Sequence, residues 1–182
     1  MKTEELANTG LGKFVLRVLA AIMESRLRHR FFAPEKALEG AGIRPGQTVL
    51  EIGCGTGFFT IPAARLLGQQ GSLVAMDRLP VSVEAVAAKA QAAGLTNVRV
   101  VEGNALDTQL DAESMDVVVV FGVIPAPMLP MDVLLAELRR ILRPDGIMAV
   151  WPPSWVHRTI RRSPLFTYVG RRHGVMSYRR TG

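Results

Sequence analysis

The sequence contains a single cysteine, Cys54, among its 182 residues. One cysteine cannot form a disulfide within the chain or supply a cysteine-based metal cluster, so we expect no metal site of that kind. The near absence of cysteine favours a reducing compartment. A chain of this length buries roughly 70% of its unfolded surface, so it needs no crosslink to hold a core.

Long hydrophobic runs are also missing. The uncharged stretch Val117–Met131 has fifteen residues and three prolines, and the apolar run Val18–Met23 is shorter still. A membrane-spanning helix needs about 20 apolar residues. The N-terminus lacks the pattern of a secretory signal. We therefore expect a cytoplasmic protein without a transmembrane segment.

Acidic residues are absent from residues 146–182, which contain seven arginines. Residues 1–50 hold eight Lys/Arg against five Asp/Glu, and residues 51–145 hold seven against eleven. The net charge of +6 therefore belongs to the two ends of the chain. Nucleic acid, anionic lipid and an acidic small molecule are all possible partners on this ground, and the charge alone does not select among them.

Hydrophobic patterning predicts strands that alternate with helices. Strands are predicted at Thr48–Ile52, Ser72–Met76, Asn97–Val101, Asp116–Phe121 and Ile147–Trp151. Helices are predicted at Pro34–Ala41, Phe58–Leu67, Pro80–Ala93 and Met131–Leu142. Leu165–Val169 and Val175–Tyr178 are predicted to form an antiparallel hairpin. Apolar strands alternating with helices indicate a parallel sheet covered on both faces.

The N-terminal segment 11–31 has the pattern of a basic amphipathic helix. Its apolar residues recur at spacings of three and four, with Lys and Arg between them. Such a helix can close over a site as a lid, dock on a membrane surface, or pack on the sheet. The sequence leaves these three roles open.

A glycine-rich turn follows the first predicted strand. Gly53, Gly55 and Gly57 alternate there, and Glu51 precedes the first glycine by two residues. Glycine permits a sharp turn and lets a ligand approach the backbone. The spacing differs from the G-x-G-x-x-G of dinucleotide sites, because Phe58 stands at the third position. A carboxylate at Glu51 favours a ligand that carries positive charge near the turn.

The next strand ends also carry polar or apolar groups suited to a nucleoside. Asp77 ends the second strand, where a carboxylate can accept both hydroxyls of a ribose. Asn104 and Ala105 follow the third strand, where an amide can pair with the edge of an adenine. Phe121 ends the fourth, where it can pack on a base or a methyl donor, or simply on the core.

Together these strand ends resemble the class I S-adenosylmethionine-dependent methyltransferases, in particular the ubiquinone/menaquinone-methyltransferase-like (type 11) group. The similar stretches are Val49–Gly57, Val74–Asp77, Val101–Asp107 and Leu138–Gly146. The resemblance covers about residues 34–182. It implies a Rossmann-like α/β fold whose seven-stranded sheet has the order 3-2-1-4-5-7-6, with the last strand antiparallel and helices on both faces. Residues 1–33 would then form a cap or lid beside a methyltransferase domain at 34–182.

The resemblance also implies S-adenosylmethionine as cofactor and a set of residues that bind it. Glu51 would hold the methionine amino group, Asp77 the ribose, and Asn104 and Ala105 the adenine edge. Arg78 and Leu79 would flank the adenine, and Phe121 would line the sulfonium side. The full cofactor-binding set is Glu51, Gly53, Cys54, Gly55, Thr56, Gly57, Asp77, Arg78, Asn104, Ala105 and Phe121.

No catalytic base is assigned from the sequence. His157 and His173 are candidates, but we expect surface or packing roles for both, and sheet positions for Tyr168 and Tyr178. Methyl transfer can rest largely on alignment of the reactants and on exclusion of water.

Three functions therefore stay open. The apolar, proline-containing stretches 123–130 and 151–155 favour a methyltransferase acting on a small, apolar or aromatic molecule, although they can equally be core. The terminal arginines fit a methyltransferase acting on RNA or another macromolecule. The lack of an evident base fits a protein that binds the cofactor without catalysis. The sequence does not determine the oligomeric state.

Overall fold

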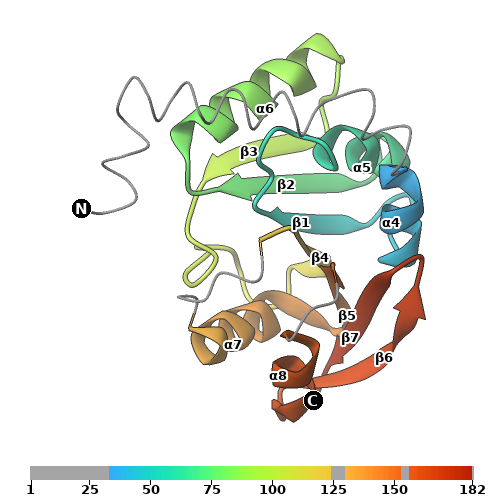
Figure 1. The fold of residues 1–182 in the computed structure, drawn as a ribbon. Coiled ribbons are helices and arrows are strands. Elements are labelled where there is room, and N and C mark those ends of the chain that lie inside the picture. The colour runs from blue at the N-terminus through green and yellow to red at the C-terminus, as the bar shows by residue number, and fades with distance from the viewer. Residues whose placement is uncertain (1–32, 124–129, 153–155, 182) are drawn as a thin grey trace. The chain divides into compact units, whose positions relative to one another are not determined.

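The fold is described from a computed structural model, which places residues 33–123, 130–152 and 156–181. Seven strands form one sheet in the order β3-β2-β1-β4-β5-β7-β6 (Figure 1). The strands are β1 Thr48–Ile52, β2 Ser72–Asp77, β3 Val98–Glu102, β4 Met115–Phe121, β5 Leu142–Trp151, β6 Phe166–Arg172 and β7 Val175–Arg180. The predicted strand order is confirmed. The N-terminal helix predicted at 11–31 lies outside the described residues.

Strands β1 to β5 run parallel, and β7 pairs antiparallel with both β5 and β6. The predicted hairpin is therefore confirmed, with a tighter turn than the sequence suggests. His173 and Gly174 form it with φ angles of 48° and 81°. Two successive positive φ angles are typical of the two-residue turn that matches the twist of a hairpin.

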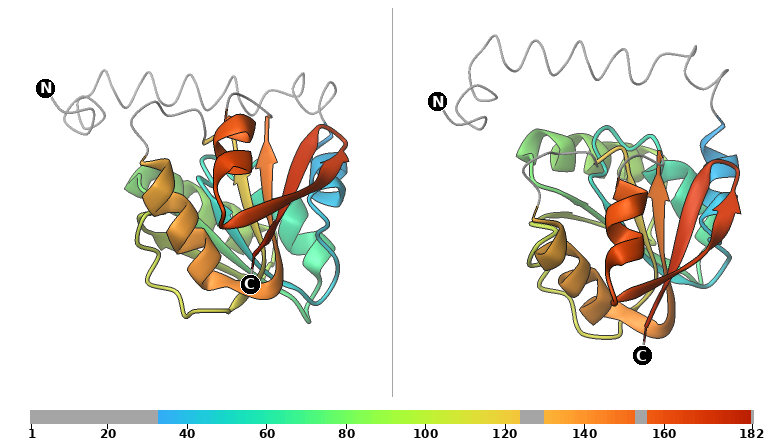
Figure 2. Two further views of the ribbon diagram at one scale, coloured as in Figure 1. Left: turned by 90° about the horizontal axis from the view of Figure 1, so that it is seen from below. Right: turned by 60° about the horizontal axis from the view of Figure 1, so that its bottom comes forward.

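Helices cover both faces of the sheet, as predicted (Figures 1 and 2). They are α4 Pro34–Gly40, α5 Thr60–Leu67, α6 Pro80–Ala92, α7 Met131–Ile141 and α8 Val156–Arg162. The helices α5 and α6 lie on one face, and α7 and α8 on the other. Among the described helices, none is both long and apolar enough to cross a bilayer.

The alternation of side chains along each strand explains why both faces are apolar. Leu50 and Ile52 of β1 join a buried cluster with Leu138 of α7 and Ile160 of α8. Their neighbour Val49 is fully buried although it points to the opposite face. Near-continuous apolar strands are what a parallel sheet between two helical layers requires.

Several element boundaries differ from the sequence prediction, and one helix was not predicted. Helix α5 begins at Thr60, two residues later than predicted, because Phe58 and Phe59 belong to the glycine-rich turn. Strand β5 begins at Leu142 and not at Ile147, with a register shift against β4. The extra pairing is supported by Arg180, whose guanidinium donates to the Leu142 carbonyl. Helix α8 is not predicted by the pattern above, since its seven residues span barely two turns.

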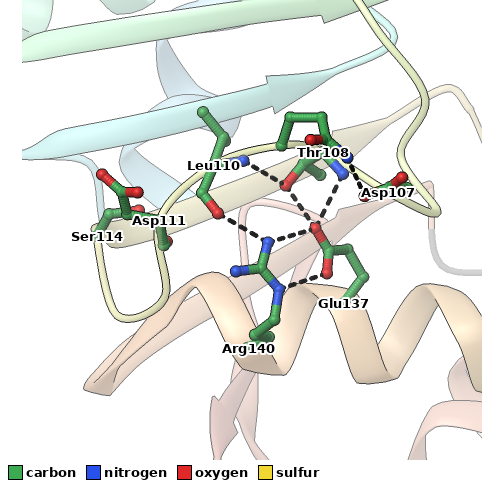
Figure 3. A network of polar contacts seen from close by, with 8 residues as sticks. Asp107, Thr108, Leu110, Asp111, Ser114, Glu137 and Arg140 are labelled. Atoms are coloured by element: carbon green, nitrogen blue, oxygen red, sulfur yellow. Dashed lines mark hydrogen bonds and ion pairs between the residues drawn. The ribbon is translucent and has the colours of Figure 1, made fainter.

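A polar network fixes the connection between β3 and β4 to helix α7 (Figure 3). The carboxylate of Glu137 accepts hydrogen bonds from the Thr108 backbone N–H at 2.9 Å and hydroxyl at 2.6 Å. Arg140 donates to the same carboxylate at 2.7 and 2.8 Å and to the Leu110 carbonyl at 2.7 Å. These donors lower the pKa of Glu137 to about 2. The network therefore holds in place the loop that begins with Asn104.

We expect Glu137→Gln to lower the free energy of unfolding by about 1–3 kcal/mol at pH 7, because the ion pair with Arg140 is lost. The pKa of this carboxyl is about 2 in the folded chain against an ordinary value of 4.5. Its contribution is thus present above pH 4.5 and lost as the pH falls from there toward 2. Urea unfolding at pH 7 and pH 3 should show a smaller difference between variant and wild type at the lower pH.

The matched control is Glu84→Gln, which changes an exposed carboxylate on α6. Its effect should stay within about 0.5 kcal/mol at both pH values. A Glu137→Gln effect of the same size at pH 3 and pH 7 would contradict the assigned role of the ion pair.

Candidate functional site

The glycine-rich turn lies between the carboxyl end of β1 and helix α5. Gly53, Gly55 and Gly57 have φ angles of 73°, 54° and 85°, a region that side-chain-bearing residues rarely adopt. The Gly53 N–H donates to the Met76 carbonyl of β2 at 2.8 Å. A Cβ atom on Gly53 would lie 2.2 Å from the Cγ2 atom of Val123. The turn therefore needs glycine both for its conformation and for the close approach of Val123.

Asp77 ends β2 beside this turn, as the sequence predicts. Its Oδ2 atom accepts the Gly55 N–H at 2.8 Å, and its Oδ1 atom accepts the Leu79 N–H at 3.0 Å. Each carboxylate oxygen has a second lone pair. Asp77 is half-buried, so its carboxylate can hold the turn and still accept from a ligand's hydroxyls.

Glu51 is a buried carboxyl on β1, with only 2% of its surface exposed. The Thr60 hydroxyl donates to its Oε2 atom at 2.6 Å. Burial raises the pKa of Glu51 to about 8, with a smaller upward contribution from Asp77 and an opposing one from the Thr60 hydrogen bond already included. A buried carboxyl of this kind stands to gain a positively charged partner.

The glycine-rich turn also contains Cys54 and Thr56, whose side-chain sulfur and hydroxyl groups are buried. Cys54 is buried and packs with Ala75 and Val86, and its thiol pKa is raised by burial and by Glu51. The Thr56 hydroxyl is buried and has no hydrogen-bond partner among the described residues. The Thr56 carbonyl accepts from Nζ of Lys89 at 2.8 Å. The packing of the Cys54 side chain leaves its backbone as the part suited to a ligand contact.

Asn104 and Ala105 follow β3 at the same edge of the sheet. The Asn104 Oδ1 atom accepts the Leu106 N–H at 3.1 Å, and the Asn104 carbonyl accepts the Asp107 N–H at 3.0 Å. Asn104 is exposed and Ala105 half-buried. These two bonds fix the turn, while the amide nitrogen of Asn104 remains suited to donate to a ligand. Arg78 is exposed at the end of β2.

An aromatic cluster adjoins the glycine-rich turn. The Phe59 ring lies 4.9 Å from the centroids of both Phe58 and Phe121, and 6.2 Å from Trp151. All these contacts are edge-to-face, the arrangement aromatic rings prefer. Phe121 is 4% exposed and therefore packs mainly within this cluster. Sequence reasoning identified Phe121 but missed Phe58 and Phe59, whose position directly after Gly57 is the available signal.

The two candidate histidines lie in different settings. Nδ1 of His157 is 2.5 Å from the Tyr178 hydroxyl, and its ring packs 5.0 Å from that of Tyr168. Burial and Arg161 lower the pKa of His157, and burial raises that of Tyr178 to about 12. His173 is exposed in the hairpin turn, 4.0 Å from Glu39. Within the described part of the chain, His157 packs and His173 is at the surface, as predicted.

No group of three or more His, Cys, Asp and Glu suited to a metal ion occurs among residues 33–123, 130–152 and 156–181. The predicted apolar stretches 123–130 and 151–155 fall largely outside these residues. What the described site presents is an acidic, glycine-lined edge with an aromatic wall. Such an edge can hold a nucleoside by its ribose and a cationic group by Glu51.

Comparison with known proteins identifies the family to which the chain belongs. A family model described as a methyltransferase domain matches residues 43–165. The nocamycin O-methyltransferase of Saccharothrix syringae is 36% identical over 126 residues, 68% of this chain and 44% of that protein. A demethylmenaquinone methyltransferase of Staphylococcus aureus is 30% identical over 117 residues, 63% of this chain and 46% of that protein. The chain thus spans less than half the length of these curated relatives.

The fold has close counterparts among solved structures. A methyltransferase from Aquifex aeolicus, described as dependent on S-adenosylmethionine, superimposes with a TM-score of 0.75 at 22% identity. The match covers 89% of this chain and 96% of that one. The family match spans β1 to β5 and both acidic strand ends, and the sheet has the expected strand order. The chain belongs to the class I S-adenosylmethionine-dependent methyltransferases.

Proposed function

We propose that this protein transfers the methyl group of S-adenosylmethionine to a small, apolar or aromatic acceptor. The observation that carries the proposal is the junction of two different surfaces at one sheet edge. Glu51 and Asp77 flank the glycine-rich turn, and the cluster of Phe58, Phe59, Phe121 and Trp151 adjoins it. The first surface suits a cationic nucleoside and the second an apolar molecule.

The residues at this edge fit the proposed cofactor. Gly53, Gly55 and Gly57 leave no Cβ in the way of a ligand at the turn. Glu51 would accept from the methionine ammonium, while the Thr60 hydroxyl donates to its Oε2 atom. Asp77 would accept from both ribose hydroxyls, while Asn104 and Ala105 would meet the adenine edge and Arg78 and Leu79 its sides. When bound, the cofactor supplies a sulfonium methyl that is open to in-line displacement.

The protein's part in the reaction would be alignment and exclusion of water. The aromatic cluster offers an apolar wall with few polar groups, against which a flat acceptor can stack beside the cofactor. The names of two relatives, nocamycin O-methyltransferase and demethylmenaquinone methyltransferase, support small acceptors. We assign no general base, because Nδ1 of His157 contacts Tyr178 and its ring packs on Tyr168.

A macromolecular acceptor is the second candidate, favoured by the exposed arginines near the C-terminus. Arg158, Arg161, Arg162, Arg171, Arg172 and Arg179 are exposed. Arg180 has a structural partner instead, since its Nη2 atom lies 2.8 Å from Glu113. Six exposed arginines can contact the phosphates of RNA, and such contacts weaken steeply with salt.

Turnover with cofactor labelled on its methyl group tests both candidates. We expect label to enter an apolar hydroxylated acceptor, from a panel of demethylated quinones, phenols and enols, in a product that partitions into organic solvent. Label recovered in RNA would favour the second candidate. Binding of the cofactor with no transfer to any acceptor would indicate a protein that binds without catalysis.

We expect Asp77→Ala to weaken binding of S-adenosylhomocysteine at least tenfold, which is about 1.4 kcal/mol. The variant loses the acceptor for the ribose and the partner of the Gly55 N–H together. Titration calorimetry measures the affinity, and thermal unfolding verifies that the variant is folded. Asp145→Ala, at an exposed acid in the first half of β5, serves as the control and should bind normally. Equal affinity of the Asp77 variant and wild type would refute the assigned site.

We expect Glu51→Gln to weaken the same binding while stabilising the ligand-free fold at high pH. The pKa of Glu51 is about 8 in the folded chain against an ordinary 4.5. The stability supplied by its proton is therefore complete below pH 4.5 and lost as the pH rises through about 8. Each unit of pKa shift corresponds to about 1.4 kcal/mol.

Urea unfolding measures this prediction. The Gln variant should exceed wild type in stability at pH 8.5 and match it closely at pH 5, because a protonated carboxyl and an amide are both neutral. A stability difference that does not change between these two pH values would show that Glu51 is not the group that titrates.

A further inference from the structure

Thr60 is a buried hydroxyl beneath the glycine-rich turn. It is the first residue of α5 and has no exposed surface. A threonine in a helix commonly donates to the carbonyl four residues earlier, which here is that of Thr56. That carbonyl accepts from Lys89 instead. The Thr60 hydroxyl donates to the Oε2 atom of Glu51 at 2.6 Å.

This contact matters because little else favours a charge on Glu51. The ionisable group that acts on it among the described residues is Asp77 at the end of β2, while Glu51 itself raises the pKa of the neighbouring Cys54 thiol. Asp77 repels a second negative charge, and burial opposes any charge at all. The Thr60 hydrogen bond is the single described interaction that lowers the pKa of Glu51.

We propose that Thr60 is a positioning residue of the cofactor site, whose hydroxyl holds Oε2 of Glu51 and leaves Oε1 to receive the ligand's ammonium group. The inference rests on the proposed function, since it takes the ligand to be the cofactor or its demethylated product. With the carboxyl protonated in the ligand-free protein near neutral pH, binding of the ammonium displaces the Glu51 proton to solvent. The Thr60 hydrogen bond then stabilises the carboxylate that remains.

Removal of the Thr60 hydroxyl should therefore weaken the binding of ligands that carry an amino-acid end and leave the binding of the nucleoside alone unchanged. Thr60→Val keeps the shape of the side chain and removes the donor, and Thr60→Ala removes the donor without adding a methyl group. Thr60→Ser keeps the donor and should restore binding. The matched pair of probes is S-adenosylhomocysteine, which carries an ammonium, and 5′-methylthioadenosine, which has the same nucleoside and no amino-acid end.

The experiment is titration calorimetry of the full chain with both probes between pH 6 and pH 9, in two buffers of different ionisation enthalpy. At pH 7 we expect Thr60→Val to bind S-adenosylhomocysteine at least tenfold more weakly than wild type, and Thr60→Ser within threefold. Affinity of the Val variant should recover toward pH 9, where Glu51 ionises without help. Both variants should bind 5′-methylthioadenosine within twofold of wild type. Wild type should release close to one proton with the first probe and none with the second.

Three outcomes would overturn the inference. An unchanged affinity and pH profile in Thr60→Val, or in Thr60→Ala if the Val variant does not fold, would show that the hydroxyl does not act through Glu51. An equal loss for both probes would indicate a structural role only. Wild type that binds neither probe would instead refute the proposed function, and this inference with it. The ligand's own amino group titrates identically in every variant, so comparisons at each pH isolate Glu51.

Discussion

The rest of the site depends on one sharp reversal of the backbone between β1 and α5. Three positive φ angles within five residues make the turn possible. Its backbone N–H groups donate to the Met76 carbonyl and to the Asp77 carboxylate, which fixes the turn to the adjacent strand. Because the turn is fixed from β2, the Asp77 carboxylate is oriented by the same contact that shapes the glycine loop. Helix α5 can then begin only after Phe58 and Phe59, which brings Thr60 over Glu51. A single conformational constraint thus orders the loop, both carboxylates and one wall of the aromatic cluster.

The two carboxyls of the site disfavour the folded state when both are charged, and they would favour binding of a cationic ligand. Two carboxyls share one edge of the sheet, and the more buried of them, Glu51, accepts a hydrogen bond from the neutral hydroxyl of Thr60. Residues 51–145, which include both carboxyls, contain eleven acids against seven basic residues. Under the proposed function, a cationic ligand would supply a positive charge here and would gain an affinity that a neutral nucleoside lacks. The Glu137 carboxylate differs, since both of its oxygens accept hydrogen bonds from Thr108 or Arg140 and tie the β3–β4 connection to α7.

Much of this architecture could be predicted from the sequence, because apolar runs bounded by glycine define the strands and the acids stand directly at strand ends. Their position at or near strand ends was enough to identify Glu51, Asp77 and Asn104 as candidate site residues. The start of β5 could not be found this way, since its pairing depends on a carbonyl that Arg180 reaches from the last strand. The role of Thr60 could not be predicted from the sequence either, because its hydrogen-bond partner lies outside its own helix. A threonine at the start of a helix suggests a local hydrogen bond, and its partner here follows from the register of β1 beneath α5 and from the competing bond of Lys89.

The aromatic cluster bears most directly on what the acceptor can be. Its rings come from the turn after β1 and from the ends of β4 and β5, three segments that meet only in the folded sheet. Phe58, Phe59 and Phe121 offer no hydrogen-bonding side-chain atom, and each is less than a tenth exposed. A polar acceptor seated against them would lose hydration without compensation, at a cost of about 1–3 kcal/mol for each unpaired group. An apolar ring would gain roughly 25 cal/mol for each Å² removed from water. Under the proposed function, an acceptor seated against this cluster would therefore be selected by its cost of desolvation, which would favour a small aromatic molecule over a phosphate-bearing polymer.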